Sequence, residues 1–160
     1  CRSQPVGLKF FNVYGINEMH KGFMMSHIPK FYEQIKKTNK LKLFKSHRKD
    51  IKDGMQSRDF IYVEDCVSIV LWFLQNPKKT GIFNVGTGQG VSVLEVIKAF
   101  ENTTSKSVPY KLSDPRKGDT VAAYADVKKI NNQLGWKAKF SLKEALQSAW
   151  NWEKELDKKS

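Results

Sequence analysis

Short β-prone segments alternate with helical segments along most of this chain, and this alternation constrains the fold more than any other feature. We expect strands at residues 6–11, 41–44, 58–62, 81–85, 108–112 and 121–124, and helices at 24–37, 64–75, 92–101, 126–135 and from 141 onward. Strands alternating with helices are typical of parallel sheets covered by helices. No internal repeat or long linker interrupts the 160 residues, so we predict an α/β fold with a sizeable core.

Local signals support several helix boundaries. The segments 92–95 and 141–144 both have the Ser-x-x-Glu spacing of a capping box, in which the serine and the glutamate satisfy each other's backbone N–H groups. Ser26 is a candidate N-cap for the first helix, and Gly135 is a candidate left-handed C-cap. These signals predict where helices begin and end.

The charge balance is strongly basic, with 28 Lys and Arg against 16 Asp and Glu and a formal net charge of +12. Such a charge could serve nucleic-acid binding, which would show a steep salt dependence. The lysines, however, are spread over the whole length, and no basic module interleaved with aromatic residues is present. We therefore predict a lysine-rich solvated surface that favours a small anionic ligand over a nucleic acid.

Neither a membrane segment nor a disulfide framework is predicted. The longest apolar run, residues 69–74, is far shorter than the roughly 20 residues of a membrane helix. Cys66 lies among apolar residues on a predicted helix and is expected to act as a small core residue, whereas a disulfide with Cys1 has no support. This cysteine usage favours a reduced, cytoplasmic setting. No His/Cys cluster has metal-ligand spacing.

A glycine-rich turn at residues 86–90 separates a predicted strand from a predicted helix. Such a turn could cradle a phosphate. Its spacing is G-x-G-x-G rather than G-x-G-x-x-G, and no acidic residue ends a strand about 20 positions later. We interpret it as a structural turn.

Three motifs have family-specific sequences. They are Phe-Asn-Val-Tyr-Gly at 11–15, Glu-Met-His-Lys-Gly at 18–22 and Arg-Asp-Phe-Ile-Tyr-Val at 58–63. Together they resemble the second half of nucleotide-sugar epimerases of the extended short-chain dehydrogenase/reductase family. Residues 6–81 are most similar to ADP-heptose 6-epimerases, and residues 91–152 to UDP-glucose 4-epimerases. The nucleotide, ADP or UDP, is left open by this mixture.

The resemblance implies a particular domain organisation. Residues 1–160 would be the C-terminal, substrate-binding part of a Rossmann-like enzyme, made of the last sheet strands and a small α/β lobe. The N-terminal dinucleotide-binding half, with its Gly-x-x-Gly-x-x-Gly loop and its catalytic Tyr-x-x-x-Lys pair, would precede Cys1 and be absent. The segment 32–36 is not taken as this pair, because its spacing is judged to differ and because it lies on a different element.

The resemblance also implies roles for residues near the first motif. Lys21 would be the catalytic acid/base and lie near the cofactor, with Val13 near the nicotinamide. A lysine can act as a base only where burial or another cation lowers its pKa. Asn12 follows a strand directly, where α/β proteins collect ligand-binding groups, and would bind the substrate. Two further substrate positions differ from the family. Phe23 stands where the family usually has Ser, and Lys30 stands where it often has His.

A second group of residues would bind the nucleotide. Phe44 would pack against the base, followed by Lys45, Ser46 and His47 in the matching stretch. Arg58 has a guanidinium fork that suits a diphosphate, and the family places it there. Arg116 and Asp119 match an Arg-x-Gly-Asp turn that contacts phosphate and ribose.

The implied activity is epimerisation of a nucleotide-diphosphate sugar through transient oxidation by bound NADP or NAD. The substrate would be ADP-heptose or a UDP-hexose, and the enzyme could be a homo-oligomer. Two other hypotheses stay open: a non-catalytic module that only binds nucleotide-sugars, and a basic nucleic-acid binder.

Overall fold

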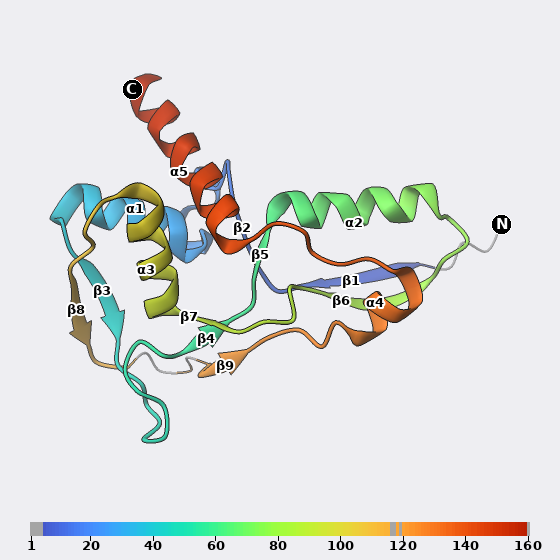
Figure 1. Ribbon diagram of the computed structural model, residues 1–160, viewed down its shortest axis with the longest axis horizontal. Coiled ribbons are helices and arrows are strands. Elements are labelled where there is room, and N and C mark those ends of the chain that lie inside the picture. Colours follow the sequence, from blue (N-terminus) through green and yellow to red (C-terminus); the bar gives the residue numbers. More distant parts are fainter. Residues whose placement is uncertain (1–4, 116–117, 119, 160) are drawn as a thin grey trace.

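The computed structural model describes residues 5–115, 118 and 120–159, and Figure 1 shows two parts joined side by side. Its elements are β1 (Val6–Phe10), β2 (Asn12–Tyr14), a 3-10 helix (Met19–Met24), α1 (His27–Thr38), β3 (Leu41–Phe44), β4 (Ser57–Arg58), β5 (Phe60–Tyr62), α2 (Val63–Gln75), β6 (Gly81–Val85), β7 (Val91–Ser92), α3 (Val93–Thr104), β8 (Tyr110–Ser113), β9 (Ala122–Ala123), α4 (Lys128–Leu134) and α5 (Leu142–Lys159). The predicted α/β class is confirmed.

Parallel pairing dominates the strands. β1 pairs with β6, β2 with β5, and β3 with β8, all in parallel, while β4 lies between antiparallel β7 and parallel β9. In Figure 1, α2 and α4 accompany the β1–β6 pair in one part, and α1 and α3 lie near β3 and β8 in the other, where α5 packs against α1 and α3. Helices therefore cover short parallel ladders, as the alternation of segments predicts.

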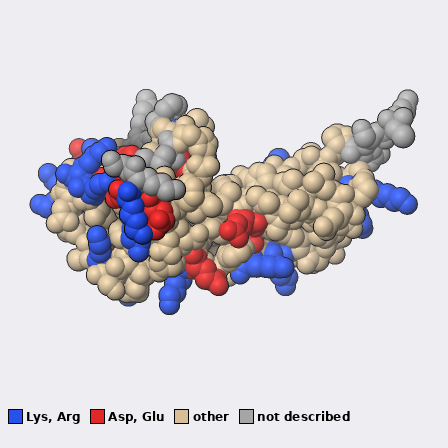
Figure 2. Space-filling model, turned by 90° about the horizontal axis from the view of Figure 1, so that it is seen from above, with Lys and Arg blue, Asp and Glu red and all other residues tan. Residues whose placement is uncertain are grey.

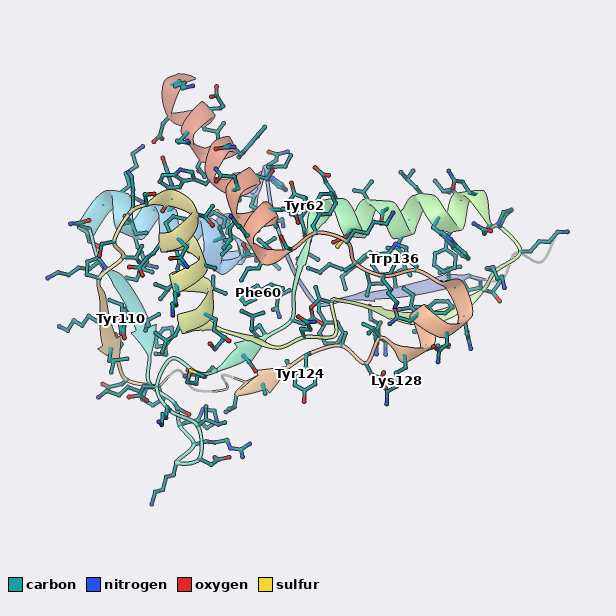
Figure 3. All side chains as sticks on the ribbon, in the orientation of Figure 1. Phe60, Tyr62, Tyr110, Tyr124, Lys128 and Trp136 are labelled. Atoms are coloured by element: carbon teal, nitrogen blue, oxygen red, sulfur yellow. The ribbon has the colours of Figure 1, made fainter. Side chains whose placement is uncertain are left out.

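Each part has its own hydrophobic cluster. Cluster 1 joins α1, β3, α3 and α5, and its buried members include Phe31, Leu43 and Phe100. Cluster 2 lies between α2, β6 and α4, and includes Ile69 and Phe83. Phe60 and Tyr62, labelled in Figure 3, belong to cluster 1, whereas Ile61 belongs to cluster 2. Because side chains alternate along a strand, β5 contributes to both clusters and ties the two parts together.

Most predicted elements form close to their expected bounds, with two exceptions. The strand predicted at 58–62 is two strands interrupted at Asp59, and residues 12–14, for which no strand is predicted, form β2. The serine at position 26 occupies the N-cap of α1 but makes no side-chain cap bond, because its hydroxyl donates to Glu18. Both capping boxes form, with Glu95 N to Ser92 Oγ at 3.2 Å and Glu144 N to Ser141 Oγ at 3.3 Å.

Surface chemistry differs between the two parts. In Figure 2 the basic side chains on the visible face gather mainly over the part that holds α1, α3 and α5, with carboxylates among them. The outer face of α2 is largely apolar, with Val67, Val70, Leu71 and Leu74 each at least 43% exposed. No helix in the described part of the chain is both long and apolar enough to cross a bilayer.

Cys66 is expected to react slowly with thiol reagents in the folded chain. Its side chain is 8% exposed, and burial raises the pKa of its thiol to about 12, so the reactive thiolate is scarce at neutral pH. We expect iodoacetamide to label Cys66 rapidly in denaturant and only slowly without it, measured by mass spectrometry of the peptide that carries it. Equal labelling rates in the two conditions would contradict this burial.

Candidate functional site

A cavity of about 160 Å³ lies between α1, β3 and the segment leading into β4. Apolar, amide and cationic side chains share its wall, which consists of Lys30, Phe31, Gln34, Lys42, Leu43, Phe44, Gly54, Gln56, Arg58 and Val93. The buried Phe31 and Leu43 belong to cluster 1, so this part of the wall is fixed by the core. The cavity can therefore hold a ring against a rigid apolar surface.

Three residues predicted from the sequence meet at this cavity. Lys30 comes from α1, Phe44 from the end of β3, and Arg58 from β4. The Phe44 ring is 38% exposed, and Arg58 is half-buried, with Nη1 donating to the Ser57 carbonyl at 2.8 Å. An accessible ring beside two cations suits a ligand that has a flat ring and an anionic group.

The stretch after Phe44 does not line the cavity. Lys45 pairs with Asp114, with 3.8 Å between Lys45 Nζ and Asp114 Oδ1. Ser46 donates its backbone N–H to Asp53 Oδ1 at 2.8 Å, and His47 is exposed. Figure 1 shows that the loop between β3 and β4 projects away from the rest of the molecule. The contacts of Lys45 and Ser46 thus order the loop itself.

Lys21 belongs to a separate arrangement built around one buried carboxylate. Glu18 is 3% exposed and accepts bonds from the backbone N–H of Gly15 at 3.0 Å, the backbone N–H of Ser26 at 2.9 Å and the Ser26 hydroxyl at 2.8 Å. Lys21 Nζ lies 3.3 Å from Glu18 Oε2, and its side chain is 36% exposed. Glu18 therefore fixes the loop that carries Lys21, whose side chain stays partly exposed.

Asn12 and Val13 lie on β2, away from the cavity wall. Asn12 donates both its backbone N–H, at 3.0 Å, and its Nδ2, at 3.3 Å, to the Asp59 carbonyl. Val13 is half-buried and packs against cluster 2. Asp59 links Asn12 to the neighbouring Arg58, but of Asn12, Lys21 and Arg58 only Arg58 lines this cavity.

Three further predictions fall outside the described part. Arg116 and Asp119 are not among the described residues, and neither is the side chain of Phe23.

The glycine-rich turn at 86–90 encloses an anion supplied by the protein itself. Asp59 is fully buried and accepts bonds from Thr87 N at 2.8 Å, Thr87 Oγ1 at 2.6 Å, Gly88 N at 2.9 Å and Ala125 N at 3.1 Å. An added Cβ on Gly86 would lie 2.4 Å from Asp59 Oδ2, so only glycine permits this approach. The interpretation of the turn as structural is confirmed, since its amide groups are occupied.

The judgement that 32–36 has a different spacing is wrong: Tyr-x-x-x-Lys occurs at 32–36 and again at 124–128, and neither instance lines the cavity. On α1, Lys36 Nζ lies 2.5 Å from Asp157 Oδ1 of α5, and the Tyr32 hydroxyl donates to the same carboxylate. Tyr124 precedes α4 and is 60% exposed, and Figure 3 shows Tyr124 and Lys128 pointing outward from the lower side of the molecule. The first pair is bound to Asp157 and the second lies at the surface, so neither pair is placed as a catalytic pair.

Sequence reasoning missed several cavity residues, chiefly Gln56, Gln34 and Lys42. Gln56 lies two residues before Arg58, and side chains two residues apart in an extended segment point to the same face, so this spacing was an available signal. Gln34 and Lys42 come together only through the bond from Lys42 N to Gln34 Oε1 at 3.0 Å, which no local pattern indicates.

Comparisons with known proteins identify the family and the fold of the chain. Residues 2–86 match the NAD dependent epimerase/dehydratase family. The ADP-L-glycero-D-manno-heptose-6-epimerase of Nitratidesulfovibrio vulgaris is 53% identical over 92 residues, which cover 58% of this chain and 28% of that protein. A bifunctional UDP-glucose 4-epimerase and UDP-xylose 4-epimerase of Arabidopsis thaliana is 36% identical over 158 residues, covering 91% of this chain and 44% of that protein.

A solved structure extends the likeness to nearly the whole chain. The UDP-glucose-4-epimerase of Stenotrophomonas maltophila, crystallised with NAD and formylated UDP-arabinopyranose, superposes with a TM-score of 0.82 at 29% identity. The match covers 98% of this chain and 49% of that one.

The fold and the matched motifs define an α/β protein of the extended short-chain dehydrogenase/reductase type. This chain belongs to the NAD dependent epimerase/dehydratase family. It spans less than half the length of each relative named above.

Proposed function

We propose that this chain supplies the substrate-binding part of a nucleotide-sugar epimerase. The observation that carries the proposal is the cavity where Lys30, Phe44 and Arg58 meet, because its ring and cations match a nucleoside diphosphate in chemistry. Relatives named as epimerases of ADP-heptose and UDP-glucose support the same class of ligand.

In this proposal Phe44 packs on the base, and Arg58 and Lys30 bind the diphosphate. Lys21 is the acid/base group that acts on the sugar, with Asn12 as a further sugar contact. Arg116 and Asp119 would contact phosphate and ribose. The Lys21 side chain is 36% exposed and is bound to Glu18, which suits a group that must reach a ligand from a fixed loop.

Two substrates remain candidates. The ADP-heptose hypothesis has its support in the 53% identity to a heptose epimerase over the first part of the chain. A UDP-hexose is favoured by the relative that is 36% identical over 158 residues and by the TM-score of 0.82 to a UDP-glucose epimerase. A module that binds nucleotide-sugars without catalysis would use the same cavity.

The described residues offer few groups that could bind a dinucleotide cofactor. The sequence contains no Gly-x-x-Gly-x-x-Gly loop, and the glycine-rich turn at 86–90 is bonded to Asp59. Two residues were expected to contact the cofactor, Val13 and Lys21. Val13 packs against cluster 2, so only Lys21 offers it a partly exposed polar side chain. When bound, NADP or NAD would accept and return the hydride of the sugar. We propose that its binding half is not among these 160 residues.

This last proposal predicts that the 160-residue chain is inactive alone. We expect no turnover of ADP-heptose or UDP-glucose with added NAD⁺ or NADP⁺, measured by NMR of the sugar anomeric region. Turnover by the isolated chain would overturn the proposal that the cofactor-binding half is not among these residues.

Replacing Arg58 with alanine tests the binding site. A hydrogen bond to a charged group contributes about 1.5–3 kcal/mol, so we expect Arg58→Ala to weaken UDP and ADP binding about 10- to 100-fold by isothermal titration calorimetry. The matched control is Arg48→Ala, because Arg48 is exposed, pairs with Asp50 and lies outside the cavity. The affinity of Arg48→Ala for UDP and ADP should stay within about twofold of the wild-type affinity.

Equal losses in both arginine variants would mean that general positive charge, not this cavity, attracts the nucleotide. Binding of DNA or RNA more tightly than UDP and ADP, with a steep salt dependence, would instead favour the nucleic-acid hypothesis. The absence of any UDP or ADP binding would remove the basis for the proposed function.

A further inference from the structure

The side chain of Gln56 holds a buried hydrogen-bond acceptor in the cavity wall. The residue is 4% exposed, and its Nε2 donates to the Phe44 carbonyl at 3.1 Å. Its other polar atom, Oε1, is buried and has no hydrogen-bond partner among the described residues. Buried side-chain polar atoms normally have a partner, so an orphan acceptor in a ligand cavity calls for a donor.

The orientation of this amide is determined by its surroundings. A flipped amide would set Oε1 against the Phe44 carbonyl, which is itself an acceptor, and would lose the bond to Nε2. The oxygen is therefore the atom left for a ligand. An amide oxygen only accepts, so the ligand atom opposite it must carry an N–H or an O–H.

The backbone around Gln56 is held in place. Val93 N donates to the Gln56 carbonyl at 3.2 Å, and Leu94 N donates to the Gly54 carbonyl at 3.1 Å. An added Cβ on Gly54 would lie 2.7 Å from Leu94 Cγ, which shows how closely this segment packs on α3. The acceptor is thus preorganised, and it lines the same cavity as Phe44 and Arg58.

We propose that Gln56 is a specificity-determining residue that accepts an N–H bond from the edge of the nucleobase. The inference rests on the proposed function, because it assigns the base of the same nucleoside diphosphate. The shared chemistry is an edge N–H, which uracil presents at N3 and adenine at its exocyclic N6. A base without that hydrogen leaves Oε1 unpaired and is discriminated against.

Methylated nucleotides test this contact in the 160-residue chain by isothermal titration calorimetry. One arm compares UDP with N3-methyl-UDP, and the other compares ADP with N6,N6-dimethyl-ADP. In the wild type we expect methylation to weaken binding roughly 5- to 50-fold in the arm that contains the true base. In Gln56→Met, which conserves side-chain length, the ratio between parent and methylated nucleotide should fall to about 1 to 2.

The matched control is Gln34→Met. Gln34 also lines the cavity, but its Oε1 already accepts the backbone N–H of Lys42 at 3.0 Å. This variant should keep the wild-type ratio. A melting temperature within a few degrees of wild type would show that both variants are folded, and a Gln56→Ser variant repeats the measurement if Gln56→Met is not.

Each outcome decides the proposal. A ratio that collapses only in the Gln56 variants supports the contact, and the arm in which it collapses identifies the base. Tight UDP or ADP binding with the same methylation penalty in all variants would overturn the role of Gln56 while leaving the proposed function intact. No binding of either nucleotide would overturn both.

Discussion

Asp59→Ala is expected to lower the free energy of unfolding by about 3–5 kcal/mol, the largest effect of any substitution considered. The carboxylate is fully buried and accepts four bonds, from Thr87, Gly88 and Ala125. Its removal would leave these donors without their partner, and the Ala125 N–H is buried. The measurement is urea denaturation followed by circular dichroism.

Two further variants make the Asp59 experiment specific. Asp114→Ala removes a carboxylate whose side chain is 98% exposed, and should change the free energy of unfolding by no more than about 0.5 kcal/mol. Asp59→Asn keeps the shape but turns one acceptor into a donor facing donors, and we expect an intermediate loss. If Asp59→Ala unfolded at the same urea concentration as Asp114→Ala, the bonds around the glycine-rich turn would contribute little.

Glu18→Ala should cost about 2–4 kcal/mol of stability and loosen the loop that carries Lys21. Glu18 is 3% exposed, and its loss leaves the N–H of Gly15 and both polar groups of Ser26 without their acceptor. Hydrogen exchange at these two amides, measured by NMR, should accelerate strongly in the variant, whereas exchange in cluster 2 should follow only the global stability.

The control for Glu18 is Glu33→Ala. Glu33 forms a surface pair with Lys37 on α1, with 3.7 Å between Glu33 Oε2 and Lys37 Nζ, and such pairs contribute about 0–1 kcal/mol. Unchanged exchange at Gly15 and Ser26 in Glu18→Ala would show that the loop is held by its backbone and not by this carboxylate.

Features encoded by neighbouring residues could be predicted from the sequence. The capping boxes at 92–95 and 141–144 and the left-handed cap at Gly135 all form, because each depends on residues within one helical turn. The end of α5 could not be predicted, because it depends on contacts with another helix: α5 reaches Lys159, and Asp157 is bound to Lys36 and Tyr32 of α1.

The candidate site was predictable only in part, for the same reason. Lys30, Phe44 and Arg58 have the right chemistry and come together at one cavity, as the family motifs imply. The separation of Asn12 and Lys21 from that cavity depends on the pairing of β2 with β5 and on the bonds of Glu18, which are tertiary contacts. No local pattern indicates that Gln56 would keep a buried acceptor that has no hydrogen-bond partner in the described part of the chain.

The parallel ladders also determine how the chain must fold. Val6 pairs with Gly81, Leu41 with Tyr110, and Asn12 with Phe60, so each ladder joins segments dozens of residues apart. Closing such large loops loses chain entropy before any strand contact compensates for it. Helices α2, α3 and α5 can form early from local contacts, whereas the strands must wait for distant partners. Refolding should therefore be slower than for an all-helical chain of equal length. Its rate-limiting step should be the pairing of distant strands in their native register.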